Sequence, residues 1–427
     1  MKTIENNKLF IDGVSCSYLR ENFNTPLIVY SKEEIEQRID EIKHDFLNKY
    51  PNTRCAYASK AFLCLEMCRI IDKAGLYLDV VSLGELSVAL KAGFPAEKIE
   101  FNGNNKSEEE IKATVSLKVG RVIVDGVDEI ELLENECKKQ NTKVKCLLRV
   151  SPGVDSHTHK YITTGHLDSK FGIPLSREIF NPVFEKAVKS KYIQLLGFHF
   201  HVGSQLFENS SHLKAVTVIL DLVNEVNQRY GFITKELNIG GGFGIKYMPN
   251  DTRPEYSYFL DPVMEMIKEK FSLLGMDMPA VVIEPGRSIA GEAGTTLYTV
   301  GTVKEIPGVR KYVSVDGGMT DNIRPALYEA CYTALNAENV ESKDREVVTI
   351  CGKACESGDI LIRDIDLPKL KRGDLLAVCS TGAYCYSMAS NYNMHLKPAV
   401  VMTEKGSAKL IIKRQTLESL WENDEMI

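Results

Sequence analysis

The chain has 427 residues, more than one domain usually contains, so we expect two domains. Its net charge of -6, without a block of lysines and arginines, argues against a nucleic-acid partner. No apolar run approaches the roughly 20 residues that span a bilayer, and the N-terminus lacks a signal-peptide pattern. The 11 cysteines show no paired metal-type spacing and suit a reducing compartment. We therefore expect a cytoplasmic protein with no membrane partner and no metal site.

Residues 1–30 contain two short β patterns, at 9–11 and 26–30. Ser31 and Glu34 then form a capping-box pattern, which predicts a helix over residues 33–50. From there, apolar strand-like runs alternate with amphipathic helical segments, as in a parallel α/β protein. The predicted strands cover residues 54–59, 77–82, 99–103, 122–125, 145–151, 195–202, 236–240 and 280–284.

These are eight strands, and most of them follow one another in the sequence at about the length of one βα unit. This pattern favours a closed (β/α)8 TIM-like barrel over residues 31–290. A doubly wound open sheet is the rival fold. A polar, His-rich insertion at 155–172 interrupts the rhythm after the fifth strand. Beyond residue 290 the β patterns lie at 295–305, 312–315, 347–351, 375–379, 399–403 and 409–412. We therefore expect an α/β barrel plus a C-terminal all-β domain, residues 291–427, which also takes in the strands of residues 1–30.

In such a barrel the active site lies at the C-terminal ends of the strands. The first strand leads into Lys60, and its alternation places Ala56, Ala58 and Lys60 on one face. A lysine there can hold an aldehyde cofactor as a Schiff base. The alternative is an ordinary surface lysine past a strand end, so the choice depends on the other strand ends.

The sixth predicted strand ends in two histidines that alternate with two phenylalanines. Alternation points His199 and His201 into the barrel mouth, and Phe198 and Phe200 onto the helices. A histidine satisfied by hydrogen bonds in the core is the alternative, more so for His199 than for His201. His201, beside a turn, is a flat group that can stack on a ring.

The seventh and eighth strands end in residues suited to an anion and to a cation. Gly240, Gly241 and Gly242 let the backbone approach a ligand and present N–H groups to a phosphate, although such turns are more often only tight turns. Glu284 is a carboxylate on a buried strand end and needs a cationic partner, such as a protonated pyridine nitrogen. With Lys60, these groups match the features of pyridoxal phosphate.

Taken together, these motifs resemble those of the barrel-type pyridoxal-phosphate decarboxylases (fold type III, alanine-racemase-like), above all the diaminopimelate decarboxylase family. The resemblance covers nearly the whole chain. Its motifs lie at residues 57–61, 82–85, 157–165, 169–172, 199–205, 240–242, 284–287, 324–328, 355–359 and 382–384.

The resemblance implies that Lys60 bonds the cofactor, pyridoxal 5'-phosphate, and that His201 stacks on its ring. Glu284 would hold the pyridine nitrogen protonated, and Cys355 would donate a proton after CO2 leaves. The groups implied around the phosphate are Ser204, Gly240, Gly241, Gly242, Gly286, Arg287 and Tyr384. The implied substrate-binding residues are Arg287, Arg324, Tyr328, Glu356 and Tyr384. It also implies a homodimer in which Cys355 and Glu356 reach the partner's barrel, so that the active sites are shared.

A substrate with an amino-acid group at both ends fits these residues. Once one end has joined the cofactor, the other still presents a carboxylate, which suits Arg287 and Arg324, and an ammonium, which suits Glu356. We therefore expect decarboxylation of meso-2,6-diaminopimelate to L-lysine. The alternatives are a related decarboxylase of lysine, ornithine or another diamino acid, a racemase on the same barrel, and a non-catalytic homologue, which should have lost Lys60.

Overall fold

The computed structural model describes residues 1–154 and 169–427, which form two compact units. The barrel unit comprises residues 39–244 and 253–286, and the β unit comprises residues 1–38, 245–252 and 287–427. Most of the insertion predicted at 155–172 lies outside the described residues. The domain limits expected at 30 and 290 stay predictions, because compactness alone does not show that either unit folds by itself.

Within the described residues, eight parallel strands of the barrel unit close into a ring, which confirms the predicted barrel. The ring runs β5-β6-β7-β8-β9-β11-β12-β13 and is closed where β13 pairs with β5. All eight predicted strand runs form strands of this ring. They are β5 (Thr53–Ala58), β6 (Tyr77–Val80), β7 (Ile99–Phe101), β8 (Arg121–Val124), β9 (Val144–Ser151), β11 (Ile193–His199), β12 (Glu236–Asn238) and β13 (Ala280–Ile283); the short β10 (Ile173–Pro174) pairs with β9.

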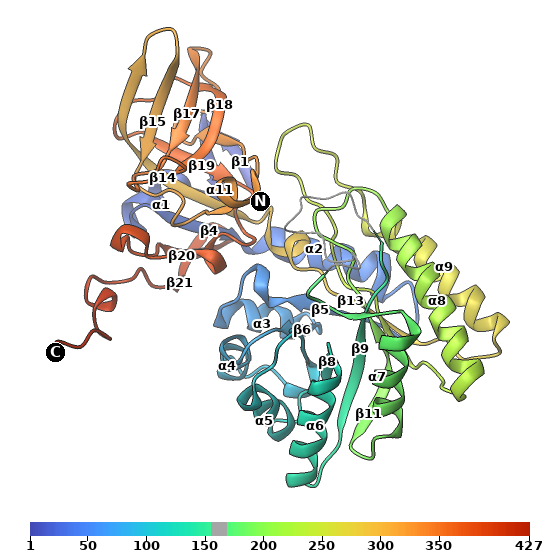
Figure 1. Ribbon diagram of the computed structural model, residues 1–427. Coiled ribbons are helices and arrows are strands. Elements are labelled where there is room, and N and C mark those ends of the chain that lie inside the picture. Colours follow the sequence, from blue (N-terminus) through green and yellow to red (C-terminus); the bar gives the residue numbers. More distant parts are fainter. Residues whose placement is uncertain (155–168) are drawn as a thin grey trace. The chain divides into compact units, whose positions relative to one another are not determined.

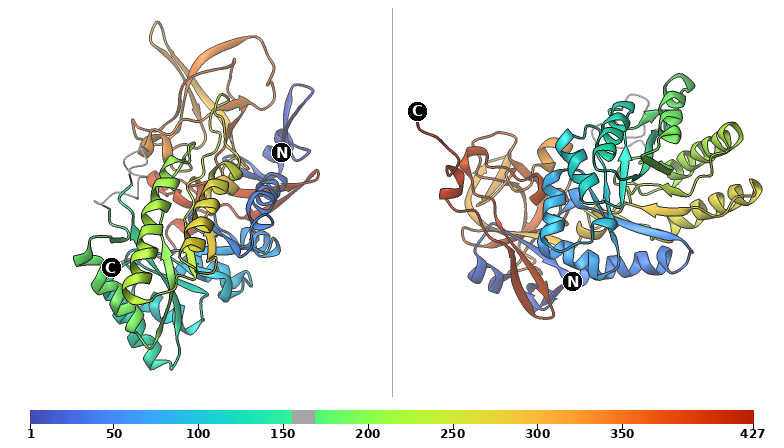
Figure 2. Two further views of the ribbon diagram at one scale, coloured as in Figure 1. Left: turned by 90° about the vertical axis from the view of Figure 1, so that its right-hand side faces the viewer. Right: turned by 90° about the horizontal axis from the view of Figure 1, so that it is seen from below.

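Helices surround the barrel strands, as Figure 1 and the right-hand view of Figure 2 show. They are α3 (Leu65–Lys73), α4 (Leu83–Lys91), α5 (Glu108–Ser116), α6 (Val127–Lys139), α7 (Arg177–Lys189), α8 (Ser210–Tyr230) and α9 (Tyr256–Leu273). Phe198 on β11 packs against Phe180 and Phe184 of α7, with ring centroids 6.2 Å apart in both pairs. The outward orientation predicted for Phe198 is therefore correct.

The helix predicted over 33–50 forms in two parts. Helix α2 (Lys32–Ile42) is followed by a π-helical turn at Lys43–Leu47. Ser31 Oγ accepts a hydrogen bond from the Glu34 backbone N–H at 3.0 Å, as expected of a capping residue. The boundary between the two units falls inside α2.

The β unit contains a large sheet in which the chain's N-terminal part takes a place, as predicted. Its strand order is β18-β17-β15-β14-β4-β20-β21, with β19 pairing to β14 and to β16. The strands are β4 (Leu27–Ser31), β14 (Gly294–Ile306), β15 (Arg310–Val315), β16 (Ala334–Asn336), β17 (Arg345–Cys351), β18 (Ile360–Pro368), β19 (Leu375–Cys379), β20 (Ala399–Glu404) and β21 (Ser407–Ile412). The strand β4 is antiparallel to β14 and parallel to β20.

A smaller antiparallel sheet, β1 (Lys2–Glu5), β2 (Lys8–Ile11) and β3 (Val14–Ser15), precedes helix α1 (Cys16–Phe23). Its apolar residues Leu9, Ile11 and Val14 share a buried cluster with Leu27 and Val29 of β4. Two short helices, α10 (Arg287–Ala290) and α11 (Arg324–Tyr328), complete this unit. The predictions did not include β1, β3, β16, β18 or α1.

A buried ion cluster holds three strands together where they begin. The carboxylate of Glu236 on β12 is 2% exposed and lies 2.6 Å from Arg54 Nη2 on β5 and 2.9 Å from Arg121 Nη2 on β8. Strands β5 and β8 are not neighbours of each other, so this cluster spans the barrel interior. We found no helix among the described residues long and apolar enough to cross a membrane.

Candidate active site

Lys60 lies at the C-terminal end of β5, but in a turn rather than on the strand. The strand ends at Ala58, and Ser59–Ala61 form a 3-10 turn. This turn ends the strand alternation before Lys60, and within it the Ser59 hydroxyl donates to the Asp79 carbonyl oxygen. The prediction that Lys60 shares a strand face with Ala58 is therefore wrong. The lysine side chain is 45% exposed, and its Nζ lies 4.0 Å from Asp79 Oδ2, so the amine is accessible at the barrel mouth.

Asp79 on β6 lies beside this lysine, and Asn102, directly after β7, bonds Asp79; neither residue was predicted from the sequence. Asn102 Nδ2 donates to Asp79 Oδ1 at 2.6 Å and to Glu284 Oε1 at 3.2 Å. Both Asp79 and Asn102 are buried. The amide therefore links the carboxylate beside Lys60 to the carboxylate that was predicted to face a cofactor ring.

Glu284 lies directly after β13 and is held by polar side chains from three strands. His199 Nε2 lies 3.1 Å from both of its oxygens, and Asn238 Nδ2 donates to its Oε1 at 2.8 Å. His199 thus bonds through Nε2 alone, since its buried Nδ1 has no hydrogen-bond partner among the described residues. It still points into the barrel, as alternation predicted.

Burial would raise the pKa of Glu284, but the charge of His199, its hydrogen bond and the Lys60 ammonium lower it below its ordinary value. Burial, with the neighbouring Glu284, raises the pKa of Asp79 to about 8. Two carboxyl groups near one lysine therefore divide their roles. Glu284 stays ionised near pH 7, whereas the raised pKa of Asp79 favours its protonated form.

The three predicted glycines form the turn after β12. Gly240 has φ +69°, and a Cβ on it would lie 2.7 Å from the Phe200 carbonyl oxygen and 2.8 Å from His201 Nδ1. The Gly241 N–H donates to His201 Nδ1 at 3.3 Å, so the ring proton of a neutral His201 is on Nε2. Burial lowers the pKa of His201 well below its ordinary value, which keeps the ring neutral.

His212 on α8, which was also not predicted from the sequence, supports the same turn. Its Nε2 donates to the Gly241 carbonyl oxygen at 2.9 Å, and its ring stacks on the Phe243 ring, with ring centroids 5.7 Å apart.

Two further predicted site residues lie in loops. Ser204 is half-buried in the loop after β11. Gly286 lies against the Lys60 turn, since a Cβ on it would lie 2.9 Å from Ala58 Cβ and 3.1 Å from Ala61 Cβ.

In the β unit, Arg287, Arg324, Tyr328 and Tyr384 form one cluster. The Arg324 guanidinium carbon lies 5.4 Å from the ring centre of Tyr328 and 5.7 Å from that of Tyr384. The Arg287 guanidinium carbon lies 4.8 Å from the ring centre of Tyr384. Tyr384 has φ +61°, an uncommon backbone conformation that recurs at functional sites. Both arginines are buried.

Cys355 and Glu356 are exposed and lie on a separate turn of the β unit. Buried Asp359 fixes this turn, since it accepts hydrogen bonds from the Ala354 N–H at 2.8 Å and from the Met319 N–H at 2.7 Å. The Cys355 N–H donates to Asn393 Oδ1 at 2.7 Å. The thiol and the Glu356 carboxylate therefore project from a backbone that is held in place.

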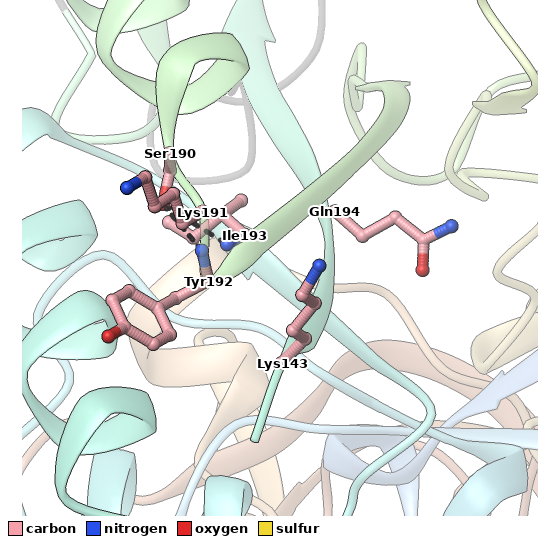
Figure 3. Close-up of a pocket in the computed structure, with 6 residues that line it drawn as sticks. All are labelled: Lys143, Ser190, Lys191, Tyr192, Ile193 and Gln194. Carbon is pink, nitrogen blue, oxygen red and sulfur yellow. Dashed lines mark hydrogen bonds between the residues drawn. The ribbon is translucent and has the colours of Figure 1, made fainter. Parts of the chain in front are cut away.

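The hollow drawn in Figure 3 lies at the other end of the barrel. It is lined by Lys143 and residues 190–194, where β9 and β11 begin, and Ser190 Oγ accepts hydrogen bonds from the N–H groups of Tyr192 and Ile193 at 3.1 Å. None of the predicted site residues lines it. The candidate site is instead the set of strand ends around Lys60.

The strand-end residues fit pyridoxal phosphate. Lys60 offers an accessible amine, and Glu284 an ionised carboxylate for a ring N–H. In the Gly240 turn the N–H groups of Gly240 and Gly241 donate to Asn238 Oδ1 at 3.0 Å and to His201 Nδ1 at 3.3 Å, so Gly242 is the glycine of this turn suited to offer a backbone N–H to a phosphate. These observations agree with the comparison with known proteins.

A family model described as "Pyridoxal-dependent decarboxylase, pyridoxal binding domain" matches residues 33–291. A curated diaminopimelate decarboxylase from Bacillus subtilis (strain 168) is 49% identical over 416 residues, which is 97% of this chain and 95% of the relative. This chain belongs to the diaminopimelate decarboxylase family. The family predicted from the motifs is thus confirmed, and so is the cofactor, pyridoxal phosphate.

Other members of the diaminopimelate decarboxylase family agree over the full length. One from Staphylococcus aureus (strain COL) is 44% identical over 425 residues, 99% of each chain. The crystal structure of the M. jannaschii diaminopimelate decarboxylase in complex with L-lysine has a TM-score of 0.93 and 35% identity, and the match covers 100% of this chain and 98% of that one. The similarity therefore includes both the barrel unit and the β unit.

Proposed function

We propose that this protein decarboxylates meso-2,6-diaminopimelate to L-lysine and CO2, the last step of lysine biosynthesis. The observation that carries the proposal is the similarity to diaminopimelate decarboxylases over nearly the whole chain, at 49% identity to the Bacillus subtilis relative. Residues in both units support it, because each unit contains side chains suited to one part of this substrate.

When bound, pyridoxal phosphate supplies an electron sink for the electron pair left behind as CO2 departs. Lys60 is the residue that holds its aldehyde carbon, since its amine is accessible at the barrel mouth. Glu284 accepts the N–H of the ring nitrogen and keeps that nitrogen protonated. Neutral His201 presents a flat face to the ring. The phosphate would be surrounded by Ser204, the Gly240, Gly241 and Gly242 turn, Gly286, Arg287 and Tyr384, as the family motifs imply.

The distal end of the substrate is an amino acid in its own right. We assign its carboxylate to Arg287 and Arg324, since guanidinium groups bind carboxylates in a bidentate way. Tyr328 and Tyr384 line the same cluster. Glu356 is assigned to the distal ammonium. A purely cationic tail, as in ornithine or lysine bound at the cofactor, would be repelled by the two arginines.

The step after CO2 loss needs one proton on the carbon that bore the carboxylate. We assign this proton to the Cys355 thiol, which projects from the turn fixed by Asp359. A Cys355→Ala variant should lose most of its turnover and still bind pyridoxal phosphate and lysine. Undiminished turnover in that variant would remove Cys355 from the role.

A substrate panel tests the proposed function. CO2 release is measured from meso-diaminopimelate, L-lysine and L-ornithine with the protein loaded with pyridoxal phosphate. We expect kcat/KM to be highest for diaminopimelate by at least about a hundredfold, because the two arginines would otherwise be left without their carboxylate. Faster turnover of lysine or ornithine would instead favour the related diamino-acid decarboxylases. Racemisation without CO2 would favour a racemase.

We further propose a homodimer with shared sites, working in the cytoplasm. The 11 cysteines, all free thiols in the structure, suit a reducing compartment. If Cys355 and Lys60 of one site come from different subunits, mixing inactive Lys60→Ala and Cys355→Ala chains should restore about a quarter of the wild-type activity, since half of the dimers would contain one intact site. Light scattering on the purified protein would give its mass, and mixing without recovery would contradict the shared site.

A further inference from the structure

Tyr247 lies between the two arginines to which we assign the substrate carboxylate. Its hydroxyl oxygen is 2.5 Å from Arg287 Nη1, so the guanidinium donates to it. Its ring centre lies 5.9 Å from the Arg287 guanidinium carbon and 5.7 Å from that of Arg324. The side chain is 8% exposed. One tyrosine therefore contacts both cations.

A second tyrosine connects Tyr247 to Arg324. The Tyr332 ring meets the Tyr247 ring edge-on, with centres 5.2 Å apart and planes at 84°. The Tyr332 hydroxyl accepts a hydrogen bond from Arg324 Nε at 2.9 Å. The contacts thus run from Arg287 through Tyr247 and Tyr332 to Arg324, all within the β unit. This chain of contacts fixes the spacing of the two guanidinium groups.

The aromatic rings also offset part of the repulsion between the guanidinium groups of Arg287 and Arg324. A guanidinium over the face of a tyrosine is attracted by the ring quadrupole, by about 0.5–2 kcal/mol depending on burial. Tyr384 adds a second shared ring, 4.8 Å and 5.7 Å from the two guanidinium carbons. Without these rings, two buried cations would repel each other and turn apart.

We propose that Tyr247 is a positioning residue that sets the separation and orientation of Arg287 and Arg324 for the distal carboxylate of the substrate. The proposal rests on the proposed function of this site and adds a residue that does not itself carry charge. Tyr247 is on residues 245–252, a segment that follows the Gly240 turn in the chain and belongs to the β unit. The proposal gives this tyrosine a role beside the two arginines. The affinity for any ligand with a distal carboxylate should therefore depend on Tyr247, and the affinity for a ligand without one should not.

The test uses Tyr247→Phe, which removes only the hydroxyl, and Tyr247→Leu, which also removes the ring. For Tyr247→Phe we expect KM for diaminopimelate to rise about three- to tenfold, the effect of one hydrogen bond to a charged group, with kcat within about twofold. Tyr247→Leu should raise KM further. Inhibition by the product L-lysine, which keeps the distal carboxylate, should weaken in parallel. Inhibition by cadaverine, which has no carboxylate, should be unchanged.

The matched control is Tyr50→Phe, which also removes a hydroxyl bonded to a charged side chain, Asp261 Oδ1 at 2.7 Å. It should leave KM and both inhibition constants at wild-type values. If Tyr247 is only structural, lysine and cadaverine inhibition will weaken equally and the melting temperature will fall, and this would overturn the proposal. So would an unchanged KM in both Tyr247 variants. Failure of the proposed function would look different, because the wild type itself would then not release CO2 from diaminopimelate.

Discussion

His199 Nε2 lies 3.1 Å from both carboxylate oxygens of Glu284, inside a ring of strands that buries both side chains. Asn102 and Asn238 donate to the same carboxylate. This shell is the reason that the carboxylate stays ionised in spite of its burial. A fixed negative charge at this strand end can hold a pyridine nitrogen protonated.

The first prediction is that Glu284→Gln removes that charge with little change of shape. We expect kcat to fall by roughly a hundredfold or more, the usual loss when a preorganised electrostatic partner is removed. Binding of pyridoxal phosphate, followed by absorbance, should persist, because Lys60 and the Gly240 turn are unchanged. A variant that keeps kcat within about threefold of the wild type would show that Glu284 does not tune the cofactor.

A second prediction concerns the buried cluster at the start of the strands. Glu236→Ala leaves Arg54 and Arg121 without their carboxylate, so the free energy of unfolding should fall by about 3–5 kcal/mol. Denaturant unfolding measures this. Glu66→Ala is the control, since its pair with Arg69 is exposed and should contribute less than about 1 kcal/mol. Equal losses in the two variants would mean that the buried cluster is no more important than a surface pair.

The third prediction is that His212 supports the phosphate turn. His212→Phe keeps a flat ring on Phe243 and removes the donor to the Gly241 carbonyl oxygen. The dissociation constant of pyridoxal phosphate from the apoprotein should rise about tenfold, as a buried acceptor loses its partner. Fluorescence titration of the apoprotein measures it, with the exposed His44→Gln as control. Unchanged affinity in His212→Phe would separate His212 from cofactor binding.

The fourth prediction is a pH dependence of stability at Asp321. Burial raises the pKa of this carboxyl from 3.8 to about 7. Between about pH 4 and pH 7 the native state therefore holds a proton that the unfolded state has lost. Stability falls as the pH rises through this window, by about 1.4 kcal/mol per pH unit at most, and the penalty is constant above about pH 7.

Asp321→Asn carries no such proton, and its amide oxygen can still accept from the Gly318 N–H, which bonds Asp321 Oδ2 at 3.0 Å. Relative to the wild type, the free energy of unfolding of this variant should rise by about 3–4 kcal/mol between pH 4 and pH 8. Urea unfolding at a series of pH values measures the difference. A difference that does not change with pH would mean that Asp321 is ionised in the native state throughout.

The sequence allowed the barrel to be predicted because apolar strand runs alternate with amphipathic helices at regular spacing. It also placed Gly240 and Glu284 at strand ends, where chemistry is expected. It misplaced Lys60, because a strand's alternation alone does not show that the strand ends at Ala58 and that a 3-10 turn begins at Ser59. The strand β18 (Ile360–Pro368) was missed because Asp364, with φ +50°, interrupts its alternation.

The polar shell of the site could not be predicted from the sequence for a different reason. Asn102 lies directly after β7 and Asn238 lies on β12, and only closure of the ring brings both to the Glu284 carboxylate, while Asp79 on β6 is linked to it through Asn102. Tyr247 lies on a segment without strand or helix, so no periodicity indicates its direction. Only contacts across the folded chain identify such residues.

The most direct test of the central claim is the joint measurement of CO2 and L-lysine formed from meso-diaminopimelate. The assay compares wild-type protein with Lys60→Ala, each supplied with pyridoxal phosphate. We expect the wild type to form the two products in equal amounts, and Lys60→Ala to lose at least about a thousandfold in rate, because it lacks the amine that holds the cofactor. Wild-type protein that forms neither product, or a Lys60→Ala variant as active as the wild type, would contradict the account.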